Sequence, residues 1–207
     1  MNRKNAPHIE LLQGCIKELV LEFEKNPFNF LSEDDVKCHL FMKLWSKGNF
    51  DRLQRTEDGQ EISALHSEVT YFDERHELSV HTDISIINPE QTDVYSRGRR
   101  HRGSGAELSK QYEFRESFAV VEIKYNRGTW SKGNTKRYWT NDLEKLQKLQ
   151  KRIPTMHYFS VLLDKKGHFS SSELNEIQQR YPEIAIAYGN PKKLVHGDSR
   201  VQTSPHV

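Results

Sequence analysis

The chain has 207 residues, of which 35% are hydrophobic, and its 31 basic and 29 acidic side chains leave a formal net charge of only +2. A chain of this size can bury a substantial core, and its balanced charge excludes nucleic-acid binding through total charge, so any such contact needs a local patch. The two cysteines, Cys15 and Cys38, exclude a disulfide framework and are expected to be buried free thiols. No apolar run is long enough to cross a membrane, and residues 1–7 lack the apolar core of a signal peptide, so we expect a cytoplasmic protein with no membrane partner.

Four helices are predicted from apolar residues that recur at helical spacing. The first covers residues 8–25 and ends at Asn26-Pro27. The second begins at Ser32, which forms a capping-box pattern with Asp35, and it ends at Gly48-Asn49. Two further helices are predicted over residues 137–152 and 170–180.

Five strands are predicted, over residues 64–72, 78–87, 118–125, 155–163 and 183–188. Three strands in a meander, followed by a crossover helix into the next strand, imply an α/β fold with a mixed sheet of four to five strands flanked by helices. We expect a single domain over residues 1–189, in which residues 8–31 form an N-terminal helical extension and residues 32–163 the core. Residues 190–207 are expected to form a flexible tail.

The strand over residues 118–125 changes character along its length. Both of its faces begin apolar, which is typical of a central strand covered on both sides. Glu122 and Lys124 then follow on one face, because alternate residues of a strand share a face. Charged side chains at the end of a buried strand need a partner or a function, so this pair is either structural or part of a site.

The neighbouring strands add further acids. Regular alternation places Asp83 on one face with His81 and Ser85, while Val80, Thr82, Ile84 and Ile86 share the other. On the preceding strand, Glu68 shares a face with His66. If the three strands are adjacent, Glu68 and Asp83 converge with Glu122 and Lys124. A cluster of carboxylates with a lysine is typical of a Mg²⁺ site that also binds phosphate oxygens.

Asp83, followed on a later strand by Glu122-Ile123-Lys124, resembles the motif of the PD-(D/E)XK nuclease superfamily, which has the restriction-endonuclease-like fold. The order of elements over residues 32–163 is similar to the core of that fold: helix, three-strand meander, helix, strand. Thr82 stands where the family motif has proline.

The resemblance implies Mg²⁺- or Mn²⁺-dependent cleavage of phosphodiester bonds, with DNA as the expected substrate. Asp83 and Glu122 would be metal ligands together with the backbone carbonyl of Ile123, and Lys124 would orient or help deprotonate the attacking water and stabilise the developing charge. Glu68 is a further candidate ligand.

Three more residues have two open interpretations each. Glu33 is a candidate for the metal or its surroundings, but an acid is also favoured at a helix N-terminus because of the helix dipole. His66 and His81 are candidates for proton transfer or phosphate contact, and the alternative is that they only form hydrogen bonds to neighbouring side chains.

Two basic segments are candidate nucleic-acid contacts. The first contains Arg99 and Arg100, and the second covers residues 126–139 and contains Arg127, Lys132, Lys136 and Arg137 interleaved with aromatic residues. The alternative for both segments is a solvated charged loop. We favour the second because it directly follows the strand of Glu122 and Lys124.

The sequence therefore predicts a metal-dependent nuclease. A catalytically silent nucleic-acid-binding or assembly subunit with the same fold is the main alternative, and an interaction module with a structural Glu122–Lys124 pair is a third. Double-strand cleavage by one site per chain would require a homodimer.

Overall fold

The computed structural model describes residues 6–56, 59–72, 79–93, 113–114 and 117–191. Its centre is a five-stranded sheet with the order β3-β4-β7-β8-β9. The strands are β3 (Leu65–Phe72), β4 (Ser79–Ile87), β7 (Ser117–Asn126), β8 (His157–Asp164) and β9 (Ile184–Gly189). β4 pairs antiparallel with β3 and with β7, whereas β8 pairs parallel with β7 and with β9. The predicted α/β fold with a mixed sheet is therefore confirmed.

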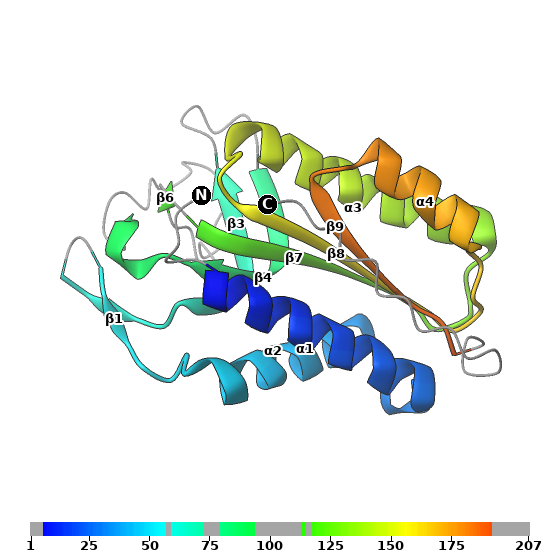
Figure 1. The fold of residues 1–207 in the computed structure, drawn as a ribbon, viewed down its shortest axis with the longest axis horizontal. Helices are drawn as coiled ribbons and strands as arrows, with labels where there is room; N and C mark the ends of the chain where they lie inside the picture. Colours follow the sequence, from blue (N-terminus) through cyan, green and yellow to red (C-terminus); the bar gives the residue numbers. More distant parts are fainter. Residues whose placement is uncertain (1–5, 57–58, 73–78, 94–112, 115–116, 192–207) are drawn as a thin grey trace, which may run out of the picture.

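Helices cover both faces of this sheet (Figure 1). One layer consists of α1 (Ala6–Lys25) and α2 (Glu33–Gly48), and the other of α3 (Lys132–Arg152) and α4 (Ser171–Arg180). Helix α2 begins with the predicted capping box between Ser32 and Asp35. None of the helices in the described ranges combines the length and the hydrophobicity of a membrane span.

The remaining elements are short. They comprise two 3₁₀ turns, η1 (Pro27–Asn29) and η2 (Pro89–Gln91), and two small strand pairs, β1 (Gln54–Arg55) with β2 (Glu61–Ile62) and β5 (Thr92–Asp93) with β6 (Glu113–Phe114). The predicted tail and the segment with Arg99 and Arg100 lie outside the described residues, apart from residues 190 and 191.

Two sequence predictions about helices need correction. Helix α3 begins at Lys132, not at residue 137, because the Ser131 hydroxyl caps it by accepting a hydrogen bond from the Asn134 N–H at 3.3 Å. Its first turn is largely exposed and therefore carries no apolar stripe that could be recognised in the sequence. Cys15 is a buried free thiol as expected, but Cys38 is exposed on α2.

Each helical layer has its own core against the sheet. Leu12, Phe23 and Leu40 from α1 and α2 pack with Ile123 of β7. On the opposite face, Trp139 and Leu143 of α3 pack with β-strand residues such as Val120. From Ala119 onward, alternate residues of β7 thus lie on opposite faces, as the strand pattern predicts. Phe118 is an exception, because it packs in the α1–α2 core with Ala119 beside a register shift between β4 and β7.

Along β3 and β4, the alternation of side chains between the two faces of the sheet is interrupted. Leu65 and Ile84 pack in the α1–α2 core, whereas Val69 and Val80 pack in the α3–α4 core, although regular alternation would place Leu65 with Val69 and Val80 with Ile84. The prediction that Val80, Thr82, Ile84 and Ile86 share a face is therefore wrong. The paired residues on either side, Ser67 with Ile84 and Val69 with Thr82, enclose Glu68 and Asp83.

The backbone explains this change of face. Glu68 has a φ of 57°, in the left-handed region that non-glycine residues rarely adopt. On the opposite strand, the hydroxyls of Thr82 and Ser85 are 2.9 Å apart, although residues three positions apart on a regular strand lie on opposite faces. Both strands are therefore rotated at Glu68 and Asp83, the positions of two candidate metal ligands.

Candidate active site

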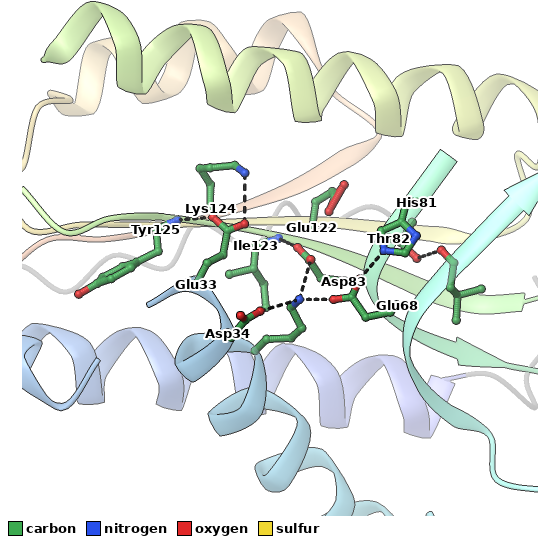
Figure 2. Close-up of polar contacts among 12 residues, drawn as sticks. Glu33, Asp34, Glu68, His81, Thr82, Asp83, Glu122, Ile123, Lys124 and Tyr125 are labelled. Atoms are coloured by element: carbon green, nitrogen blue, oxygen red, sulfur yellow. Dashed lines mark hydrogen bonds and ion pairs between the residues drawn. The ribbon is translucent and has the colours of Figure 1, made fainter. Parts of the chain in front are cut away.

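The candidate site lies where β4 separates from β7. Backbone pairing between these strands ends at Ile84 and Val121, and Asp83 is the residue of β4 that directly precedes Ile84. The Asp83 carboxylate occupies the gap, where its Oδ2 accepts a hydrogen bond from the Ile123 N–H at 2.7 Å (Figure 2). Asp83 is only 9% exposed, so this carboxylate is held inside the sheet, next to Glu122 of β7.

Glu122 is buried, and its side chain projects from β7 toward α3 (Figure 2). Its carboxylate forms an ion pair with Lys145 of that helix. Burial, and next the negative charge of Asp83, raise the pKa of Glu122 well above its ordinary range. Two adjacent buried carboxylates repel each other when both are ionised, so a proton or a neighbouring positive charge stabilises the pair.

Lys124 is fixed between two helices from opposite layers. Its Nζ lies 3.1 Å from Asp142 Oδ2 on α3 and 3.4 Å from Glu33 Oε1 on α2. Burial by itself would lower the pKa of Lys124, but Asp142 and Glu33 together raise it. Lys124 is therefore a firmly protonated ammonium group, a donor rather than a base.

Glu33 belongs to this arrangement although it stands in the first turn of α2. Its Oε2 accepts a hydrogen bond from the Tyr125 N–H at 3.2 Å, next to its contact with Lys124 (Figure 2). Burial raises the pKa of Glu33, and the charge of Lys124 only partly offsets this effect. The Glu33 carboxylate thus contacts β7, the strand that carries Glu122 and Lys124. The helix dipole alone does not account for its position.

A second lysine approaches from the α2 side. Lys37 Nζ is 3.4 Å from Asp83 Oδ1 and 3.2 Å from Asp34 Oδ1, and it also contacts Glu68. Burial alone would lower the pKa of Lys37, but Glu68, Asp83 and Asp34 together raise it. Asp83 consequently has a permanent positive charge beside it.

Glu68 and the two histidines form the outer part of the site. Glu68 contacts Lys37 and the Nε2 atom of His81, and His81 Nδ1 lies 2.9 Å from Thr70 Oγ1. Burial would raise the pKa of Glu68, but Lys37 and His81 outweigh it and lower the pKa. His66 Nε2 instead lies 2.7 Å from the Ser63 carbonyl oxygen, so its ring bonds to the local backbone.

The predicted basic residues fall into three groups. Arg99 and Arg100 lie outside the described residues. Arg127, Lys136 and Arg137 have exposed side chains, and the Arg137 guanidinium stacks 4.8 Å from the Tyr138 ring centroid. Lys132 forms an ion pair with Glu173 of α4 at 2.6 Å.

Sequence reasoning missed Lys37, Asp142 and Lys145. All three stand on helices, where a charged residue on the polar side is ordinary and carries no recognisable signal. Asp142 and Lys145 are three residues apart and therefore share one side of α3. Their Oδ1 and Nζ atoms are 3.4 Å apart, which joins Glu122 and Lys124 into one chain of alternating charge.

The donor set is compatible with a hard cation, although it is small. Within the described residues, no group of three His, Cys, Asp or Glu side chains is arranged to hold a metal ion. Asp83 and Glu122 are adjacent, however, and burial, followed by the charge of Asp83, raises the pKa of Glu122. Two carboxylates with a backbone carbonyl and water are ligands that Mg²⁺ prefers.

Comparisons of the chain with protein-family models, with curated proteins and with solved structures give no significant match.

Proposed function

We propose that this protein is a metal-dependent nuclease that hydrolyses phosphodiester bonds, with DNA as its substrate. The observation that best supports this function is the hydrogen bond from the Ile123 N–H to the Asp83 carboxylate. It holds Asp83 against β7 beside Glu122, and Lys124 follows two residues later on the same strand. Two carboxylates that attract a cation, next to a fixed positive charge, suit the binding and cleavage of a phosphodiester.

Each residue would have a distinct role. Asp83 and Glu122, with the Ile123 carbonyl, would hold Mg²⁺ or Mn²⁺, and Glu122 would release its proton when the cation binds. The cation would polarise the phosphodiester and lower the pKa of a bound water. Lys124 would donate hydrogen bonds to the attacking water and to the phosphate oxygens, because its raised pKa makes it a poor proton acceptor. Glu33 and Asp142 would keep its amine in place.

A second candidate function is a catalytically silent nucleic-acid-binding or assembly subunit. The specific observation in its favour is that each carboxylate already has a lysine partner: Lys37 for Asp83, Lys145 for Glu122 and Lys124 for Glu33. Such a network compensates its own charges and can stabilise the fold without any cation.

Plasmid cleavage separates the two functions. Wild-type protein is incubated with supercoiled DNA and Mg²⁺ beside Asp83→Ala, Lys124→Ala and, as a control on the exposed side of α3, Lys148→Ala. We expect Asp83→Ala to lose both metal binding and cleavage, whereas Lys124→Ala retains metal binding and cleaves about 10²–10³-fold more slowly. Lys148→Ala should match wild type.

Cleavage by Lys124→Ala at the wild-type rate would exclude the mechanism given above. If wild-type protein binds DNA and Mg²⁺ titration gives no cleavage, the silent subunit replaces the nuclease.

A further inference from the structure

The turn between α1 and α2, which lies next to β7, exposes two large apolar side chains. Phe28 of η1 is 82% exposed and Leu31 is 70% exposed. Burying side chains of this size normally stabilises a fold, and this fold leaves both of them in contact with solvent. Isolated exposed apolar residues are common, so their surroundings decide what these two could bind.

The lysine that directly follows β8, Lys165, contacts this turn. Lys165 Nζ lies 4.9 Å from the centroid of the Phe28 ring and 5.6 Å from that of Tyr125, and it donates a hydrogen bond to the Phe30 carbonyl at 3.3 Å. The Tyr125 hydroxyl donates to the same carbonyl. The position of the Phe28 ring is therefore defined on one side by a cation, while most of its surface faces solvent.

The same turn is connected directly to the candidate active site. Tyr125 follows Lys124 on β7, and its N–H donates to Glu33, which contacts Lys124. In Figure 1 the α1–α2 turn and the carboxyl ends of β7 and β8 lie at the same end of the molecule, on the right. A nucleic-acid strand bound at Lys124 would thus pass within reach of Phe28.

The charges around Phe28 favour a polyanion. Arg127 and Lys166 are exposed. A Cβ at Gly128, the residue after Arg127, would lie 3.8 Å from Lys165 Cβ and 3.9 Å from Lys166 Cγ, so the backbone that follows Arg127 packs beside both lysines. Within the described part of the chain, none of Arg127, Lys165 and Lys166 forms an ion pair. Unpaired cations beside an exposed aromatic ring suit a nucleic-acid strand, in which phosphates alternate with flat bases.

We propose that the Phe28 ring stacks on an unpaired nucleobase, and that the preferred substrate therefore contains a single-stranded segment. The inference rests on the proposed nuclease function, because it names the substrate class of that site. A base inside a duplex is covered on both faces by its neighbours in the stack, so away from the duplex ends only an unpaired base can offer a free face to Phe28. Lys165 would then lie close to the phosphate of the stacked nucleotide.

Binding without metal tests this proposal independently of cleavage. Fluorescence anisotropy with EDTA compares a labelled single-stranded oligo(dT) with a blunt duplex for wild type, Phe28→Ala and Phe28→Trp. Met42→Ala is the matched control, since Met42 is 63% exposed on α2. We expect Phe28→Ala to weaken oligo(dT) binding by about 5- to 150-fold, the range for loss of one stacked base, and to leave duplex binding unchanged. Phe28→Trp should retain oligo(dT) binding, and Met42→Ala should match wild type.

Three results would overturn the proposal: no oligo(dT) binding by wild type, equal losses on both probes, or self-association of wild type that Phe28→Ala abolishes. The last result would identify the turn as a contact between copies of the chain. Phe28-dependent binding to oligo(dT) without any Mg²⁺-dependent cleavage would instead contradict the nuclease function and leave the stacking site standing.

Discussion

Asp142 of α3 and Lys124 of β7 form an ion pair with 3.1 Å between Oδ2 and Nζ. The amine of Lys124 therefore takes its direction from a helix that follows it in sequence. Asp142→Asn keeps the size of the side chain but removes the charge that orients Lys124. We expect kcat for plasmid cleavage to fall about tenfold, less than for Lys124→Ala because Glu33 still holds the amine, with KM unchanged.

Glu144→Gln on the same helix is the control for this change, because its carboxylate faces Arg180 rather than the site. Unaltered kcat in Asp142→Asn would show that the ion pair does not position Lys124.

Divalent cations should stabilise the protein through the Asp83–Glu122 pair. Mg²⁺ at ten times its dissociation constant adds about 1.4 kcal/mol to the free energy of unfolding, which corresponds to a rise in Tm of about 3–6 °C for a chain of this length. Thermal melts with and without Mg²⁺ measure the shift. Asp83→Asn should abolish it, whereas Asp51→Asn, at an exposed acid, should not. An equal shift in both variants would place the cation elsewhere.

The pH dependence of stability should reveal Glu122. Because the folded state raises its pKa above the ordinary 4.5, its contribution to stability is greatest below pH 4.5 and is lost as pH rises toward the raised value. Glu122→Gln cannot ionise, so it should gain at least about 1 kcal/mol relative to wild type between about pH 5 and about pH 8 in EDTA. Urea unfolding at both pH values measures this difference.

Glu176→Gln, at an exposed acid of α4, should show no such gain. A constant difference between Glu122→Gln and wild type across this pH range would contradict the raised pKa of Glu122.

Salt dependence should distinguish the basic residues. Arg127 and Lys136 are exposed, and each alanine substitution should reduce the slope of log affinity against log salt by about one unit if the side chain contacts a phosphate. Lys132→Ala should have a smaller effect, because a phosphate must compete with Glu173 for that amine. The same prediction extends to Arg99 and Arg100.

Lys151→Ala, at the far end of α3, is the control for these variants. If none of the substitutions changes the salt slope, the segment is only solvated surface.

The main elements could be predicted from the sequence because each has a strong local pattern. The strand of Glu122 was recognisable since two charges interrupt a run of apolar residues, and the Ser32 cap marks the start of α2. The partners of these charges could not be predicted, because Lys37, Asp142 and Lys145 come from helices whose packing against the sheet is a tertiary property. The change of face depends on a left-handed backbone conformation at Glu68. Such a conformation is usually marked by a glycine in the sequence, and here the residue is a glutamate.

The rotation of β3 and β4 at Glu68 and Asp83 also affects how the protein unfolds. Each of these strands contributes its first or last residues to the α1–α2 core and the remainder to the α3–α4 core. Neither helical layer can detach without exposing apolar residues of a strand that the other layer needs. The two cores should therefore melt in one cooperative transition, in which the fluorescence of the fully buried Trp139 follows the loss of helix in α1 and α2.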